Sequence, residues 1–314
     1  SIFGEEHFRD RVDLQPGAFY QRLQKDPLRP TTFQAGVGDF LEATDHMGYS
    51  SDACSYHRAV TGAVVKGFMP NPEFLIGTTN PCSGGLAVLE NMAQRFGKKL
   101  FVLHIPQDES GGNVRYLANQ IRDMAAFITH ATGTPLNPDR LKVAIDHTNK
   151  ARDIMMDVYA LARTVPSPVT SRDLGNFGIV MALFLGTEAA VKIAEAYREE
   201  FARRVQAHAA NGGEKPTEKF RLLWIQNRIQ FKNPLEKLLS DACGAAIVID
   251  ELNDITWEPI SNGSINAIYE GLARRSISIP FNGSIENRVK HLRKLALEYK
   301  VDGAVNPCNW GCRQ

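Results

Sequence analysis

The order of short apolar strands and helices constrains this fold most. Residues 73–80, EFLIGTTN, predict a short buried strand, because an apolar run is bounded by turn-forming residues. A glycine-containing loop and a helix closed by Gly97 follow, and KLFVLHIP at 99–106 predicts the next strand. Strand, loop, helix and strand in this order are typical of a βαβ unit in a parallel sheet.

The same alternation returns in the last third of the chain. Residues 220–226, 245–250 and 301–306 predict three more strands. One helix is expected to start at Asn233–Pro234, and an amphipathic helix is expected over 284–300. The sequence therefore predicts an α/β fold with two parallel-sheet lobes.

Helices are expected between the two lobes. Helical patterns cover 113–132, 137–164, 171–184 and 187–210, and NGGEKPTE at 211–218 has the composition of a linker. We expect four parts: an N-terminal helical and loop segment at 1–50, a first α/β lobe at 51–135, a helical segment at 136–212, and a second α/β lobe at 213–314. No helix follows the last strand, so we expect a C-terminal part to be missing or a partner to cover that face.

Composition excludes several classes of protein. The chain has 314 residues and a net charge of +1, which gives no basic surface for nucleic acid or an acidic membrane. It has no apolar run of membrane-spanning length and no signal peptide, so a cytoplasmic protein is expected. A phosphate-binding P-loop, a G-x-S-x-G elbow and an H-E-x-x-H zinc motif are all absent.

Three of the five cysteines are the main functional signal. Cys54, Cys82 and Cys312 each stand where a strand or loop meets the expected start of a helix. Helix N-termini carry partial positive charge, which lowers thiol pKa and suits an anionic sulfur-ligated centre. Three thiolates around one centre would leave a coordination position open, as catalysis requires.

Cys82 and Cys312 each follow a strand, in separate lobes. Ligands of open parallel sheets bind beyond the carboxyl ends of the strands, so we expect a metal centre in the cleft between the lobes. Zinc is the competing metal, although Cys308 and Cys312 are the only close pair. Scattered structural cysteines remain an equal alternative, and we expect Cys243 to be a small buried hydrophobe.

Residues beside the cysteines add candidates. The expected helix over 50–68 would be capped at 50–52, which places His57 and Arg58 near the Cys54 face as acid/base or anion-holding groups. A solvated surface is the alternative for both. Gly84–Gly85 would let a bulky group approach the backbone, or would simply form a tight turn.

Other polar residues have plainer interpretations. His104 ends an apolar strand, and we expect a hydrogen-bonded core histidine there. Arg274–Arg275 and the basic run at 288–294 could bind phosphate, as coenzyme A would require, but a solvated helix face is more usual. Pocket residues are expected from 20–60 and from the loop region 254–282.

Four segments together resemble a known family. CSYHRAVTG, TTNPCSGGLAVLE, KLFVLHIP and the closing KVDGAVNPCNWGCRQ resemble the 2-hydroxyacyl-CoA dehydratase family, which includes the 2-hydroxyglutaryl-CoA dehydratase and benzoyl-CoA reductase subunits. The resemblance runs from about residue 50 to the end, and its most specific motif is Trp310–Gly311–Cys312–Arg313. It implies two flavodoxin-like lobes with intervening helices.

The resemblance also implies a cofactor and a reaction. Its ligand positions fall on Cys54, Cys82 and Cys312, which would bind a 4Fe-4S cluster, with Cys308 as a spare, alternative or fourth ligand. The implied activity is a dehydratase-type lyase, or a related reductase. In the lyase, one low-potential electron passed to the thioester carbonyl of a 2-hydroxyacyl-CoA makes a ketyl radical anion, which expels the hydroxyl from the neighbouring carbon.

Partners follow from the same resemblance. It implies an acyl-CoA substrate, a homologous second subunit in a heterodimer or homodimer, and a separate ATP-dependent iron–sulfur activator. Two alternatives remain open: a benzoyl-CoA reductase-type or other low-potential reductase subunit, and a non-catalytic electron-transfer or scaffold subunit. A two-lobe binding protein without metal is a further class.

Overall fold

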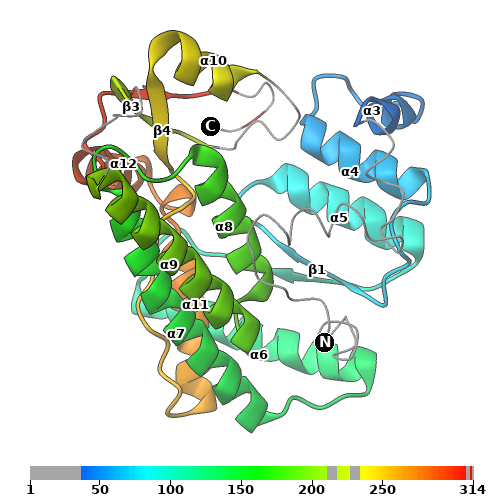
Figure 1. The fold of residues 1–314 in the computed structure, drawn as a ribbon. Helices are drawn as coiled ribbons and strands as arrows, with labels where there is room; N and C mark the ends of the chain where they lie inside the picture. The colour runs from blue at the N-terminus through cyan, green and yellow to red at the C-terminus, as the bar shows by residue number, and fades with distance from the viewer. Residues whose placement is uncertain (1–36, 211–217, 227–233, 309–311, 313–314) are drawn as a thin grey trace.

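A computed structural model describes residues 37–210, 218–226, 234–308 and 312 (Figure 1). It confirms a mixed α/β fold with parallel strands in two small sheets. The elements of these residues, in chain order, are α3 (Val37–Asp45), α4 (Ser55–Val65), β1 (Leu75–Thr78), α5 (Ser83–Phe96), β2 (Leu100–Leu103), α6 (Gly111–Thr132), α7 (Pro138–Ala162), α8 (Ser171–Phe184), α9 (Glu188–Ala210), β3 (Phe220–Trp224), α10 (Leu235–Cys243), β4 (Ala245–Asp250), α11 (Ile265–Ile277), the 3-10 helix η2 (Pro280–Asn282), α12 (Ile285–Glu298) and β5 (Gly303–Val305).

The first sheet is the predicted βαβ unit. β1 and β2 pair in parallel, from Leu75 opposite Leu100 to Thr78 opposite Leu103. α5 connects them and ends at Gly97, whose φ of 63° is a left-handed conformation that glycine adopts without strain. A small apolar core joins α4, β1 and α5, and it contains Val64, Leu75, Val88, Met92 and Ala93.

The second sheet has the strand order β4-β3-β5, and both pairings are parallel. Its core is larger, because α7, α8, α9 and α12 pack together against β3 and β4. Phe177, Phe201, Leu223 and Ile249 are among its buried residues. The helical segment between the two sheets thus forms one core with the second lobe (Figure 1).

Residues 254–282 were expected to form a loop region, and this expectation is wrong, because they contain the helix α11. α11 packs on α6 through Tyr269 and Ala273, which share a core with Val114 and Leu117. Its buried positions recur every three or four residues, which is the spacing of one face of a helix. A segment that follows β4 therefore returns to cover a helix of the first lobe.

Two predicted core residues are in fact exposed. Cys243 is the last residue of α10, a helix that buries none of its side chains, so the expectation of a buried hydrophobe is wrong. His104 is also exposed; the Gln120 side chain accepts from its backbone N–H at 2.8 Å and donates to its carbonyl at 3.1 Å. The backbone N–H and carbonyl groups of His104 therefore have their hydrogen-bond partner in Gln120, while the imidazole remains exposed.

Some expectations fall outside the described residues. They include most of the N-terminal segment, at 1–36, and nearly all of the linker, at 211–217. Among the helices that the structure describes, none combines the length and the apolar character needed to cross a bilayer.

Candidate functional site

Cys54 stands at the start of α4. The helix begins at Ser55, so Cys54 is its N-cap residue, and the expected cap at 50–52 is wrong. Ser50 and Asp52 instead bond to each other in the turn before the helix. The end at Val65 is earlier than expected, because Gly67 turns the chain with a φ of 73°.

Cys82 is the equivalent residue of α5. It lies four residues beyond the end of β1 with an extended backbone, at φ −151° and ψ 148°. Neither Cys82 nor Cys54 makes a side-chain capping hydrogen bond to its own helix. The first-turn N–H groups and the positive helix end therefore remain available to stabilise a negative sulfur at each position.

His57 lies against Cys82. Its Nε2 atom is 3.7 Å from the Cys82 Sγ atom, within hydrogen-bonding distance for sulfur. A Cβ atom added at Gly84 would be 2.7 Å from the His57 Cε1 atom, closer than side chains tolerate. Gly84 and Gly85 both lie within α5. The His57 imidazole approaches the backbone at this pair, where the absence of side chains gives it room.

The charge of His57 follows from its surroundings. Partial burial lowers the pKa of His57 below its usual value of 6.5, because burial penalises the protonated ring. The imidazole is therefore neutral at pH 7. A neutral ring can give Cys82 one N–H donor without adding a positive charge.

Arg58 points to a different group. Its guanidinium is buried, pairs with the Asp45 carboxylate and donates to the Ser51 carbonyl oxygen at 3.1 Å. These contacts tie α4 to α3 and to the turn before α4. The arrangement favours a structural role for Arg58 over one in holding an external anion.

The cysteines near the end of the chain differ from each other. Cys308 is exposed, has a φ of 45°, and donates its backbone N–H to the Asn306 side chain at 3.1 Å. Cys312 is half-buried. The pKa of Arg288 is raised, first by its hydrogen bonds to Glu251 and then by the charge of that carboxylate, with Cys312 as the smallest contribution. Cys312 therefore lies within electrostatic reach of Arg288.

The pair formed by Glu251 and Arg288 was missed in the sequence. Arg288 donates to both carboxylate oxygens of Glu251, at 2.6 and 2.9 Å, and the Gln226 backbone N–H donates at 3.0 Å. Glu251 follows β4 directly and its side chain is only 1% exposed. An acidic residue just past an apolar strand was the available signal, since that end of a parallel sheet is where ligands bind.

The basic residues proposed for phosphate are mostly engaged within the chain. Lys294 pairs with Asp254 at 3.1 Å, in the same run as Arg288. The Arg275 guanidinium lies 4.7 Å from the centre of the Trp257 ring, and burial lowers the pKa of Arg275. Arg274, by contrast, is exposed.

The iron–sulfur centre can be tested against these positions. Among the described residues, no three His, Cys, Asp or Glu side chains lie close enough to hold a metal ion. Cys54 and Cys82 nevertheless fit the chemistry of a cluster, as free, partly exposed thiols at two helix starts, one of them beside an imidazole. The structure brings together Cys82, His57 and the two glycines, and Cys54 caps the helix that carries His57. Among the described residues, Cys54, Cys82, Cys308 and Cys312 are not gathered into a metal-binding group.

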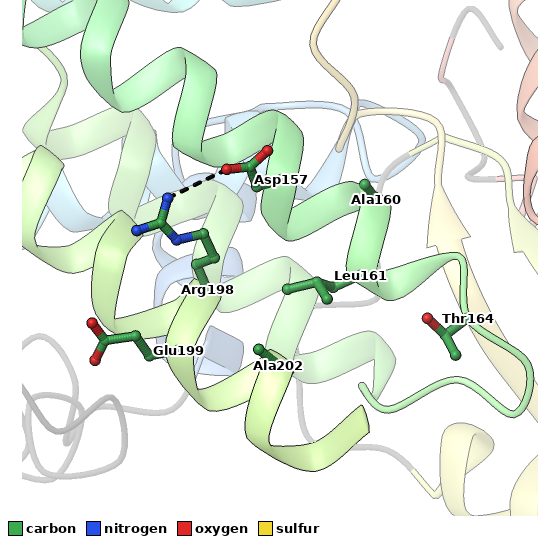
Figure 2. Close-up of a pocket in the computed structure, with 7 residues that line it drawn as sticks. All are labelled: Asp157, Ala160, Leu161, Thr164, Arg198, Glu199 and Ala202. Atoms are coloured by element: carbon green, nitrogen blue, oxygen red, sulfur yellow. Dashed lines mark hydrogen bonds and ion pairs between the residues drawn. The ribbon is translucent and has the colours of Figure 1, made fainter. Parts of the chain in front are cut away.

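A surface pocket lies between α7 and α9 (Figure 2). Arg198 and Asp157 form an ion pair of 3.3 Å across it, beside apolar Ala160, Leu161 and Ala202. None of the candidate site residues lines it, so the pocket is separate from the thiol site.

Comparisons with known proteins agree with the resemblance in the sequence. The chain is 24% identical to the alpha subunit of lactoyl-CoA dehydratase from Anaerotignum propionicum, over 96% of this chain and 78% of that protein. It is 24% identical to a subunit of benzoyl-CoA reductase from Thauera aromatica, over 87% of this chain and 68% of that one.

The alpha subunit of (R)-2-hydroxyglutaryl-CoA dehydratase from Acidaminococcus fermentans is also 24% identical, over 78% of this chain and half of that protein. The family model described as the D-component of 2-hydroxyglutaryl-CoA dehydratase matches residues 28–314, a range that contains all five cysteines. This match covers nearly the whole chain, which therefore belongs to the 2-hydroxyglutaryl-CoA dehydratase D-component family, the one that its motifs resemble.

Proposed function

We propose that this chain is the iron–sulfur subunit of an acyl-CoA-acting radical dehydratase. The observation that carries the proposal is the pair of free thiols, Cys54 and Cys82, at the N-caps of α4 and α5 in a chain of this family. The proposed reaction is the elimination of water from a 2-hydroxyacyl-CoA by one-electron ketyl chemistry. One electron is added to the thioester, hydroxide and a proton then leave, and the electron is given back, so the unsaturated acyl-CoA forms without net reduction.

The proposed cofactor is a 4Fe-4S cluster held by Cys54, Cys82 and Cys312. This ligand set is supported by the positions of Cys54 and Cys82 at two helix starts and by the electrostatic contribution of Cys312 at Arg288. Held by these three cysteines, such a cluster would supply a low-potential electron and a Lewis-acidic iron. Cys308 is proposed as a spare thiol, because it is exposed and its backbone is held by Asn306.

The residues around these thiols have separate proposed roles. Gly84 and Gly85 leave room beside Cys82, and His57 occupies part of that room. Arg58 ties α3 to α4 and sets where Cys54 lies, rather than acting on the substrate. Arg288, held by the buried Glu251, offers positive charge on the side of Cys312.

The names of the relatives support a multi-subunit enzyme. Those relatives are named as subunits, so we propose a homologous second subunit for this chain, together with a separate ATP-dependent iron–sulfur activator. A cytoplasmic location belongs to the same proposal. The likeness to the benzoyl-CoA reductase of Thauera aromatica favours a second candidate, an aromatic-ring reductase subunit.

A substrate comparison tests the proposal. The chain would be produced with its second subunit, purified without oxygen, and supplied with activator, ATP and reductant. Lactoyl-CoA and 2-hydroxyglutaryl-CoA would be compared with benzoyl-CoA, and the control omits the activator. We expect activator-dependent loss of water from a hydroxyacyl-CoA. Ring reduction of benzoyl-CoA alone would support the second candidate, and no turnover by protein shown to hold its cluster would contradict both.

A further inference from the structure

We propose that His57 is a positioning residue for the Cys82 sulfur, to which it donates a hydrogen bond from Nε2. The inference rests on the proposed function, because it concerns Cys82 as a cluster ligand. Its geometric basis is the 3.7 Å separation of Nε2 and Sγ, between side chains at the starts of two different helices.

The position of the imidazole is fixed by the backbone of α5. An added Cβ atom at Gly84 would be 2.7 Å from Cε1 and 2.9 Å from Nδ1 of His57, so any larger residue must displace the ring. At Gly85 the corresponding atom would be 3.7 Å from Nε2 and 3.8 Å from the Cys82 Sγ atom, which are ordinary contacts. The requirement for glycine to accommodate His57 is therefore specific to Gly84.

The contact also links the two helix starts. His57 lies three residues after Cys54, in the first turn of α4, while Cys82 caps α5. The His57 imidazole therefore connects the helix that Cys54 caps to the Cys82 sulfur. A change that displaces His57 would loosen Cys82 relative to Cys54 without removing either sulfur.

An N–H donor at a thiolate has a defined chemical effect. It stabilises negative charge on the sulfur, and hydrogen bonds to the sulfurs are among the factors that set the potential of an iron–sulfur cluster. Loss of the donor disfavours the reduced, more negative cluster. The midpoint potential should therefore become more negative when His57 is removed or displaced.

The experiment uses two matched pairs of variants in the anaerobically reconstituted protein. His57→Phe keeps a ring of similar size but has no N–H, whereas His57→Gln restores an amide N–H donor. Gly84→Ala displaces the imidazole, whereas Gly85→Ala makes only ordinary contacts and adds the same methyl group in the same helical turn. The measurements are the midpoint potential and the EPR spectrum, together with the alkylation rate of Cys82 in metal-free protein.

We expect His57→Phe and Gly84→Ala to lower the midpoint potential and to change the Cys82 alkylation rate, while the exposed Cys243 is alkylated as before. Gly85→Ala should lower the midpoint potential less than Gly84→Ala does, because its new contacts are ordinary ones. His57→Gln should lie between the wild type and His57→Phe. Equal potentials and Cys82 rates in wild type and His57→Phe would overturn this inference alone. A wild-type protein that binds no iron would overturn the proposed function, and the alkylation rates would still report on the contact.

Discussion

The two lobes position their thiols by different means. In the first lobe, helix starts and closely approaching backbone place Cys54 and Cys82, around a small core and a two-stranded sheet. In the second lobe, a larger core supports an ion pair between the buried Glu251 and the half-buried Arg288, at the end of β4 and within electrostatic reach of Cys312.

This difference separates two kinds of sensitivity. A site built on close backbone contact fails when a side chain gains volume, because the interior has no spare space. A site built on buried charge fails when one partner is neutralised, because the other is left without compensation. Substitutions that affect one lobe should therefore leave the other nearly unchanged.

The largest expected effect is in the second lobe, from Glu251→Gln. The change leaves the Arg288 guanidinium without its carboxylate and should lower the free energy of unfolding by about 3 kcal/mol. Urea denaturation measures it. Glu258→Gln is the control, because Glu258 is 93% exposed and pairs with Arg152 at 3.5 Å, so its loss should cost under about 1 kcal/mol. Equal losses of unfolding free energy in Glu251→Gln and Glu258→Gln would contradict the idea that the second lobe depends on a buried charge.

Gly62→Ala tests the region of α3 and α4. The new Cβ atom would overlap the Phe40 carbonyl oxygen, a backbone atom, so the two helices must separate at a cost of about 2 kcal/mol. Thermal or urea unfolding would measure the loss, and exchange of α4 amides would show where it occurs.

Gly112→Ala is the control for Gly62→Ala, since nothing lies within 4 Å of the added atom in the first turn of α6. It should leave stability unchanged or raise it by a few tenths of a kcal/mol, because alanine favours helix. A destabilised Gly112→Ala protein, or an unaffected Gly62→Ala protein, would refute the idea that close packing distinguishes α3 and α4.

An effect of similar size, confined to high pH, is expected in the core of the second lobe. Burial, and then the negative charge of Asp173, raise the pKa of Tyr197 to about 12. The unfolded chain loses this proton near pH 10, so the contribution to stability is complete below pH 10 and is lost as pH rises toward 12. It is on the order of 2 kcal/mol. Tyr197→Phe keeps the ring and should flatten that part of the stability profile; an unchanged slope would show that another group titrates there.

The smallest effect should come from Cys243→Ser. This thiol is exposed at the end of α10 and belongs to neither thiol site, so stability and iron content should match the wild type. Loss of iron in this variant would indicate that Cys243 is a cluster ligand, which contradicts the proposed ligand set.

Local sequence signals predicted much of the fold. Asn137 caps α7 with two hydrogen bonds of 3.0 Å and Pro138 opens that helix, as their side chains dictate. Gly97 ends α5 where its conformational freedom is needed. The strands were visible because apolar runs bounded by turn residues need no distant partner to be recognised.

Features that depend on tertiary contact were not predictable. The Asp45 carboxylate that engages Arg58 lies thirteen residues before it, and no pattern in the sequence connects them. The serine and aspartate before Cys54 looked like helix caps, yet they bond to each other in a turn. At the candidate site, the cysteines and the glycine pair were visible in the sequence, whereas the imidazole within reach of Cys82 became evident only from the packing of α4 on α5.

Cluster content across cysteine variants tests the central claim most directly. Protein purified and reconstituted without oxygen would be assayed for iron, acid-labile sulfide and EPR signal, in the wild type and in Cys54→Ser, Cys82→Ser, Cys308→Ser and Cys312→Ser. We predict about four iron and four sulfide per chain in the wild type and in Cys308→Ser, and loss of the cluster in the other three. A full cluster in Cys54→Ser, Cys82→Ser or Cys312→Ser, or its loss in Cys308→Ser, would contradict the proposed set of three ligands.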